Sequence, residues 1–74
     1  MKNKIAELRA KNKLTQDEFA KQLDVSRQTI ISLEKERYNP SILLAYKIAK
    51  IFSMKIEDVF LFDEQVEINH ESFS

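Results

Sequence analysis

Apolar residues in the first 60 positions recur every three or four residues, which is the spacing of one face of an α-helix. Ile5 and Leu8, for example, fall on one face of a first predicted helix. Short polar segments interrupt the pattern, so several short helices are expected rather than one long helix. The pattern predicts helices over about residues 3–12, 16–23, 26–35, 41–52 and 56–60, where the third and fourth ranges include a capping serine.

The start of the second predicted helix is the best marked of these. Thr15 and Glu18 have the spacing of a capping box, in which each side chain accepts a hydrogen bond from the backbone N–H of the other residue. Leu14 and Phe19 occupy the two positions of a hydrophobic staple around this box. The second helix is therefore expected to begin at Gln16.

The link between the second and third helices is unusually short. Only Asp24 and Val25 separate the end of the second helix from Ser26, the predicted N-cap of the third. So short a link forces a sharp crossing, which is the geometry of a helix-turn-helix unit. Ala20 is small enough to let the two helices approach closely. The wedge between them is expected to be filled by Val25, Ile30 and Leu33.

The clearest loop is predicted at residues 37–40, because Pro40 disfavours a helical conformation of the residue before it. Ser41 then caps the fourth helix. The apolar stripe predicted for this helix consists of Ile42, Ala45, Ile48, Ala49 and Phe52.

The composition favours an all-α fold. Gly is absent and Pro occurs once, which disfavours a sheet protein with many tight turns. The chain has no Cys and one His, His70, so disulfides, a metal cluster and cofactors are not expected. An enzyme is not expected either, because there is no cysteine nucleophile and no Gly-rich phosphate loop.

The chain is predicted to consist of one compact domain, residues 1–60, and an acidic tail, residues 61–74. Apolar and polar residues alternate at positions 65–68 of the tail, which is a weak strand pattern. No apolar run approaches the roughly 18 residues of a membrane span, and the N-terminus has no signal-peptide h-region. We therefore expect a cytoplasmic protein without a membrane partner or an evident small-molecule substrate.

A formal net charge of zero conceals a strong separation of charge along the chain. All 12 Lys and Arg residues lie in residues 1–55, with six acidic residues, whereas residues 56–74 carry six acidic residues and no Lys or Arg. A basic body of this kind suits contact with phosphates, with the acidic tail turned elsewhere. The alternative is an ordinary solvated surface with an uneven distribution of charge.

Counted from Gln16, small or apolar residues occupy the fifth, tenth, fifteenth and eighteenth positions of the two-helix unit. With this spacing the sequence resembles the Cro and phage-repressor (XRE) family of helix-turn-helix regulators. The residues that carry the resemblance are Leu14-Thr15-Gln16, Phe19-Ala20, Val25-Ser26-Arg27-Gln28-Thr29-Ile30, Leu33-Glu34, Tyr38-Asn39-Pro40-Ser41, Lys47-Ile48-Ala49-Lys50 and Ile56-Glu57-Asp58-Val59-Phe60.

This resemblance implies a compact five-helix, lambda-repressor-like DNA-binding domain over about residues 3–60. It also implies a prokaryotic or phage-encoded transcription regulator, of the repressor type, that binds an inverted-repeat operator in double-stranded DNA. The sequence is similar in particular to short stand-alone members that act as homodimers, such as a repressor of a cytolysin operon.

In a helix-turn-helix unit the second of the two helices, here helix 26–35, lies in the major groove, and its N-terminal residues meet the base edges. Four residues share the face of helix 26–35 that turns away from Ile30 and Leu33. The predicted base contacts are Arg27, Gln28, Ile31 and Ser32. Arg27 suits guanine, Gln28 suits adenine, and Ile31 suits a thymine methyl group. The alternative for Arg27 is a phosphate contact.

A second set of residues is expected to hold the DNA backbone without reading sequence. Gln16 begins a helix whose N-terminal amides favour an anion, and the resemblance assigns it a phosphate contact. The residues that follow the third helix form a polar, basic loop. The predicted phosphate contacts are Gln16, Ser26, Thr29, Lys35, Arg37, Tyr38 and Asn39.

The resemblance also implies that Arg9 and Glu34 form a structural salt bridge between the first and third helices. The sequence departs from the family where relatives often have a helix-ending glycine, because Asp24, Glu36 and Ser53 stand there. A left-handed Glu costs about 1 kcal/mol. The third helix is therefore expected either to run on past residue 35 or to end along a different path.

Apolar residues outside the expected core suggest a homodimer, since two-fold symmetry doubles the contact with DNA. The predicted interface consists of Leu43, Ile51, Phe60 and Phe62, and ordinary core packing is the alternative for Leu43 and Ile51. An alternative function is the antitoxin of a toxin–antitoxin pair, or another protein-interaction module with this fold, in which the tail wraps a protein partner.

Overall fold

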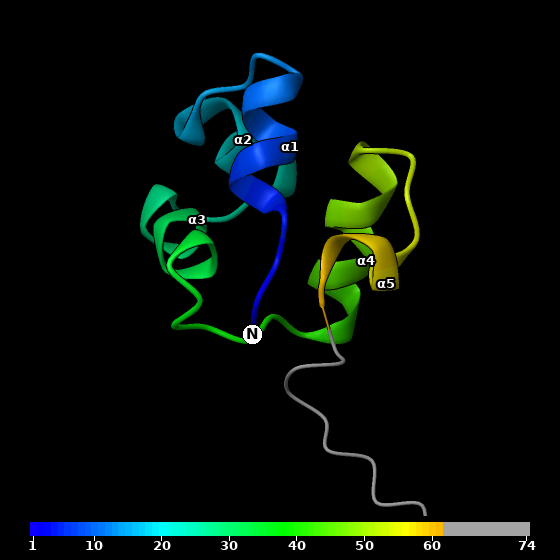
Figure 1. Ribbon diagram of the computed structural model, residues 1–74. Coiled ribbons are helices and arrows are strands. Elements are labelled where there is room, and N and C mark those ends of the chain that lie inside the picture. The colour runs from blue at the N-terminus through cyan, green and yellow to red at the C-terminus, as the bar shows by residue number, and fades with distance from the viewer. Residues whose placement is uncertain (62–74) are drawn as a thin grey trace, which may run out of the picture.

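The computed structural model describes residues 1–61, which fold into short α-helices packed around one core (Figure 1). The helices of this part of the chain are α1 (Ile5–Lys11), α2 (Gln16–Leu23), α3 (Arg27–Glu34), α4 (Ile42–Ile51) and α5 (Ile56–Val59). The strand character of these residues is limited to an isolated antiparallel bridge between Asn3 and Phe60. The predicted all-α fold with five helices is confirmed.

Side-chain caps define where three of the helices begin. The Thr15 hydroxyl accepts a hydrogen bond from the Glu18 N–H (3.0 Å), and the Glu18 carboxylate accepts one from the Thr15 N–H (2.8 Å). Ser26 Oγ caps α3 through the Thr29 N–H (3.2 Å). Ser41 Oγ caps α4 by accepting from the N–H three residues later (3.1 Å). The predicted capping box and both capping serines are present.

The first four helices all end in the same way, and without glycine. The residue after each C-terminal turn has a positive φ, at Lys13 (56°), Asp24 (57°), Glu36 (63°) and Ser53 (54°). After α3, for example, the Glu36 N–H donates to the Leu33 carbonyl and the Arg37 N–H donates to the Ser32 carbonyl, both at 3.0 Å. This is the Schellman pattern of hydrogen bonds. Glu36 therefore takes the conformation expected of the missing glycine, and α3 does not run on.

The hydrophobic core takes residues from every helix. The buried apolar residues are Ile5, Leu8, Phe19, Ala20, Leu23, Ile30, Leu33, Leu44, Ala45, Ile48, Ala49, Val59 and Phe60. Phe19 of α2 stacks on Phe52, with ring centroids 5.3 Å apart. This pair joins the helix-turn-helix unit to the end of α4.

The predicted stripe of α4 is wrong at its first position. Ile42 is 83% exposed, whereas Leu44, which the prediction left out, is buried. Leu44 lies four residues before Ile48 and shares its face, because side chains at this spacing are neighbours on a helix. Ile42 lies four residues before Tyr46 instead, and both point to solvent.

The two ends of the domain pair with each other, which shortens α1 and α5 relative to the prediction. The Lys4 N–H donates to the Val59 carbonyl (2.9 Å), and the Leu61 N–H donates to the Lys2 carbonyl (2.8 Å). The segment before α1 therefore lies beside residues 59–61, near the point labelled N in Figure 1. The predicted strand at residues 65–68 and the predicted interface residue Phe62 lie outside the described residues.

Candidate nucleic-acid interface

The turn at residues 24–26 holds α2 and α3 together as a unit. The Val25 N–H donates to the Ala20 carbonyl (3.0 Å), which closes the end of α2 directly before the Ser26 cap. Ala20 is 3% exposed, and Ile30 and Leu33 are fully buried. Because one face of α3 is buried against α2 and the core, its opposite face is turned to solvent.

The exposed side of α3 brings six of the predicted DNA-contact residues together. Arg27 and Gln28 are exposed in the first turn, and Ser32 is half-buried one turn later. A shallow depression follows this side of the helix and continues into the loop after it. The depression is lined by Ser26, Gln28, Thr29, Ser32, Arg37 and Tyr38. Two predicted base contacts and four predicted phosphate contacts therefore share one concave surface.

Ile31 is half-buried and lies outside the hydrophobic core cluster. Its neighbours in sequence, Ile30 and Ser32, have opposite environments, since Ile30 is fully buried and Ser32 borders the depression. Ile31 therefore remains accessible from the side of α3, where an apolar side chain suits a thymine methyl group.

The first turn of α3 is held by two hydroxyl groups. Ser26 Oγ accepts from the Thr29 N–H and also lies 3.0 Å from Thr29 Oγ1. These contacts satisfy one of the otherwise unpaired amides of a helix N-terminus.

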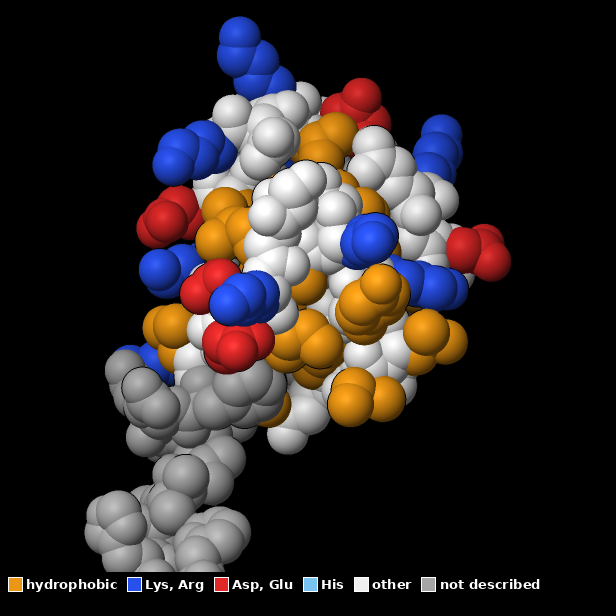
Figure 2. All heavy atoms as spheres, turned by 90° about the vertical axis from the view of Figure 1, so that its right-hand side faces the viewer, with side chains coloured by type: hydrophobic (Ala, Val, Ile, Leu, Met, Phe, Trp, Pro, Cys, Tyr) orange, Lys and Arg blue, Asp and Glu red, His pale blue; other side chains and the backbone are white. Residues whose placement is uncertain are grey.

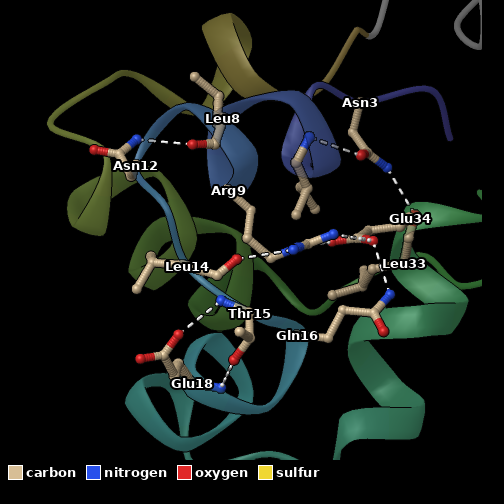
Figure 3. A network of polar contacts seen from close by, with 11 residues as sticks. Asn3, Leu8, Arg9, Asn12, Leu14, Thr15, Gln16, Glu18, Leu33 and Glu34 are labelled. Atoms are coloured by element: carbon tan, nitrogen blue, oxygen red, sulfur yellow. Dashed lines mark hydrogen bonds and ion pairs between the residues drawn. The ribbon is translucent and has the colours of Figure 1, made fainter.

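Arg9, Gln16 and Glu34 form a polar network between three helices (Figure 3). The predicted ion pair is present, with Arg9 Nε 2.7 Å from Glu34 Oε2, and Arg9 Nη2 lies 3.3 Å from Oε1. Arg9 Nη1 also donates to the Leu14 carbonyl (2.8 Å), just before α2. The guanidinium thus joins α1, the start of α2 and the end of α3, which is a structural role.

The side chain of Gln16 reaches the same carboxylate. Gln16 Nε2 donates to Glu34 Oε1 over 3.1 Å, and the Gln16 side chain is half-buried (Figure 3). An amide nitrogen carries two N–H groups, and this bond uses one of them. The second N–H and the backbone amides at the start of α2 are the groups with which Gln16 would hold a phosphate.

Asn3 was missed by the sequence analysis. Its Nδ2 donates to the Leu33 carbonyl (2.8 Å), and its Oδ1 accepts from the Ile5 N–H (3.0 Å). Asn3 therefore caps the start of α1 and holds the last turn of α3 at the same time. An Asn just before an apolar helical pattern is a capping signal, but its contact with Leu33, 30 residues away, has no local signal.

The loop after α3 is exposed and basic, as predicted. Lys35, Arg37, Tyr38 and Asn39 are all exposed, and Tyr38 retains 42% of its surface. The hydrogen bond from the Arg37 N–H to the Ser32 carbonyl sets the path of this loop. Arg37 and Tyr38 consequently border the depression beside α3.

Asp17 is a second residue that the sequence analysis missed. Its Oδ1 lies 3.7 Å from Nε of Arg27, so an acidic side chain of α2 faces the first residue of α3. The two side chains are 65% and 60% exposed. A charged pair at this place lies within the surface on which DNA contacts are predicted.

Glu18 is the neighbouring acidic residue, and it differs from Asp17 in its partner. The hydrogen bond from the Thr15 N–H, followed by that of the Thr15 hydroxyl, lowers the pKa of the Glu18 carboxyl below its usual value. The charged form of Glu18 is therefore part of the capping box at the start of α2.

No group of three His, Cys, Asp or Glu side chains within residues 1–61 is arranged to hold a metal ion. None of the helices in the same range is long and apolar enough to cross a membrane.

Comparison with known proteins gives a family for this arrangement. Residues 5–59 match the model of a helix-turn-helix family, which covers α1 to α5. An HTH-type transcriptional regulator of Archaeoglobus fulgidus is 57% identical over 65 residues, which are 88% of this chain and 92% of the relative. An HTH-type transcriptional regulator of Bacillus subtilis is 51% identical over 65 residues, which are 88% of this chain and 98% of the relative.

A more distant match is an immunity repressor protein of the Bacillus phage phi105. It is 30% identical over 71 residues, which are 89% of this chain and 49% of the phage protein. This chain therefore corresponds to about half the length of the phage repressor.

Proposed function

This chain belongs to the helix-turn-helix family of transcriptional regulators, and we propose that it is a repressor that binds an inverted-repeat operator as a homodimer. DNA binding follows from the family, and the relatives named above are regulators and a phage repressor. The proposal adds which side chains read the DNA, how two copies associate, and that binding blocks transcription. We place its action in the cytoplasm of a prokaryotic cell.

The observation that carries the proposal is the concave surface beside α3. Gln28 and Ser32 line it from the helix, and Arg37 and Tyr38 line it from the following loop. An α-helix fits the major groove of B-DNA, and a loop beside it then meets the sugar–phosphate backbone. The shape and the chemistry of this surface therefore match one strand of duplex DNA and the groove next to it.

Side chains on the exposed side of α3 read bases, with Gln28 and Ser32 in the lining of this surface and Arg27 and Ile31 outside it. Gln28 donates to N7 and accepts from N6 of adenine, and Arg27 donates to O6 and N7 of guanine. Ile31 packs against a thymine methyl group, and Ser32 makes a hydrogen bond one turn deeper. Phosphates are held by Gln16 at the start of α2, and by Ser26, Thr29, Lys35, Arg37, Tyr38 and Asn39.

The homodimer forms through the exposed apolar face of α4. Ile42, Leu43 and Tyr46 are 83%, 60% and 52% exposed, and their spacing places them on one side of the helix. Figure 2 views the side of the molecule on which α4 and α5 lie and shows hydrophobic side chains gathered there. Exposed apolar side chains that gather in this way are typical of a protein interface.

This interface differs from the set predicted from the sequence. Leu43 is retained and is joined by Ile42 and Tyr46. Phe60 is 1% exposed in the core, so it has almost no surface for a partner and is not retained. Ile51 is half-buried against the core and borders a separate surface with Tyr46, so we place it at the edge of the interface.

Two measurements test the proposal. Selection of bound DNA from a random pool is expected to yield an inverted repeat with half-sites about one helical turn, roughly 34 Å, apart. Sedimentation of the free protein is expected to give about twice the 8.7 kDa of one chain. Selection of no common sequence would contradict sequence-specific binding, and a monomer at high micromolar concentration would contradict the dimer.

The alternative function as an antitoxin gains no support from the relatives named above.

A further inference from the structure

The Asp17 carboxylate lies beside Arg27, and arginine is the residue type that most often reads guanine. Asp17 belongs to the first turn of α2, and Arg27 is the first residue of α3. Their pairing therefore depends on the crossing of the two helices and not on a local sequence pattern. We propose that Asp17 positions Arg27 for a bidentate contact with guanine and weakens binding to sites that lack this base. This inference rests on the proposed DNA-binding function.

The orientation of the ion pair supports a contact through the end of the guanidinium group. The short distance is from Asp17 Oδ1 to Arg27 Nε, at 3.7 Å. A guanidinium group has five N–H donors, of which one is on Nε and four are on the two terminal nitrogens. Nε is the nitrogen nearest the carboxylate, so one N–H of each terminal nitrogen, at the end of the group, can still donate to another partner. This pair of donors matches O6 and N7 of guanine.

The position of Asp17 opposes the main alternative, in which Arg27 contacts a phosphate. Asp17 directly follows Gln16 at the start of α2, where a phosphate of the bound DNA is expected. A carboxylate and a phosphate repel each other, so Asp17 favours DNA complexes in which its charge is paired. Arg27 pairs with the Asp17 carboxylate while the arginine side chain points into the DNA groove. If Arg27 turned to a DNA phosphate, the Asp17 charge would be left without this partner.

The effect is expected in the DNA complex rather than in the free protein. Both side chains are more than half exposed, so water screens the pair and it adds little to the stability of the fold. Bound DNA removes water from the same surface, and this strengthens the attraction between the two charges. Asp17 therefore acts on the choice of DNA site and not on folding.

The test measures discrimination at one base pair. The selected operator is compared with a version in which the guanine opposite Arg27 is replaced by adenine in both half-sites, and dissociation constants are measured by fluorescence anisotropy. The proteins are the wild type, Asp17→Asn, Asp17→Glu, Arg27→Gln and the double variant D17N/R27Q. Glu57→Gln is the matched control, because it removes the same charge from an exposed residue of α5.

The wild type is expected to prefer guanine by about tenfold or more, the range for one bidentate contact. Asp17→Asn is expected to bind both DNAs more tightly and to reduce this preference at least about threefold, since the Arg27 side chain is then free to turn to phosphates. Asp17→Glu, which keeps the negative charge, is expected to keep most of the preference for guanine. In the Arg27→Gln background the Asn substitution is expected to leave the ratio unchanged, as is Glu57→Gln in the wild type.

Three results would overturn the inference. If Asp17→Asn strengthens binding to both DNAs equally and keeps the preference, Asp17 acts only through net charge. If Arg27→Gln keeps the guanine preference, Arg27 does not read this base, although the proposed function still stands. If the wild type selects no sequence at all, the proposed function fails and this inference fails with it. Circular dichroism melting of Asp17→Asn separates these results from a loss of folding.

Discussion

Arg9 of α1 and Glu34 of α3 form an ion pair with their side chains 19% and 9% exposed and with 2.7 Å between Nε and Oε2. Glu34 is the last residue of α3, and the same carboxylate accepts a hydrogen bond from Gln16 at the start of α2. The pair therefore helps to set the position of α3 relative to α1 and α2. It is a structural element of the helix-turn-helix unit.

Removal of one partner of this pair is expected to destabilise the fold. Arg9→Met leaves the nearly buried Glu34 charge with the hydrogen bond from the Gln16 amide, and we expect a loss of about 2 kcal/mol in the free energy of unfolding. The double variant Arg9→Met with Glu34→Leu is expected to recover most of this loss, because no charge is then left buried. Urea denaturation measures both. Equal losses in the single and double variants would contradict this role of Glu34.

The left-handed conformation of Glu36 gives a second prediction. Replacement of Glu36, with φ of 63°, by Gly is expected to stabilise the fold by up to about 1 kcal/mol, because glycine adopts this conformation without a Cβ clash. For a domain of this size the melting temperature is expected to rise by about 4–8 °C. Lys35→Gly is the matched control. Lys35 has a φ of −84°, so glycine relieves no strain there and the substitution is expected to destabilise the fold. An unchanged or lower melting temperature of Glu36→Gly would contradict strain at this helix end.

The predictions from sequence succeeded where a local signal was enough. Local signals of this kind were the cap at Thr15, the serine caps and the helix-turn-helix link. Each depends on residues that are close in sequence, and a side-chain hydrogen bond to a nearby backbone N–H stabilises the start of a helix at that residue. The contacts of Asn3 with Leu33 and of Asp17 with Arg27 join different elements. They depend on the crossing angles of the helices, which the spacing of apolar residues does not determine.

Two errors of the sequence analysis have a common physical cause. Ile42 and Phe60 are both large and apolar, and both lie at the end of a helical segment, where the helical period no longer predicts which way a side chain points. Ile42 is exposed in the first turn of α4, and Phe60 is buried because the chain becomes extended and pairs with Asn3. Helix ends are the least predictable part of a sequence pattern for this reason.

A third prediction concerns acid. Because the pKa of Glu18 is lowered in the folded protein, its charged form adds stability above its ordinary pKa of about 4.5, and this contribution is lost as the pH falls through the lowered value. Melting temperatures of the wild type and Glu18→Gln are therefore expected to differ most near neutral pH and to converge below about pH 4. A difference that stays constant from pH 7 to pH 3 would show that the charge of Glu18 does not contribute.

The proposed dimer gives a fourth prediction. Leu43→Asp places a charge on the exposed apolar face of α4 and is expected to produce a monomer in sedimentation experiments. Its affinity for the full inverted repeat is expected to fall at least about tenfold, while binding to a single half-site stays unchanged. Ala6→Asp introduces the same charge on an exposed position of α1 and serves as the control. A dimer that persists in Leu43→Asp would exclude this face as the interface.

The central claim is that α3 reads bases while the loop after it holds phosphates, and parallel DNA selection with three proteins tests this most directly. The wild type, Gln28→Ala and Arg37→Ala are each used to select sites from the same random pool, and the affinities are then measured at several salt concentrations. We expect Gln28→Ala to lose preference at one position of each half-site. Arg37→Ala is expected to select the wild-type sequence but to bind it more weakly and with a smaller salt dependence. Unchanged selection and full affinity in both variants would contradict the claim.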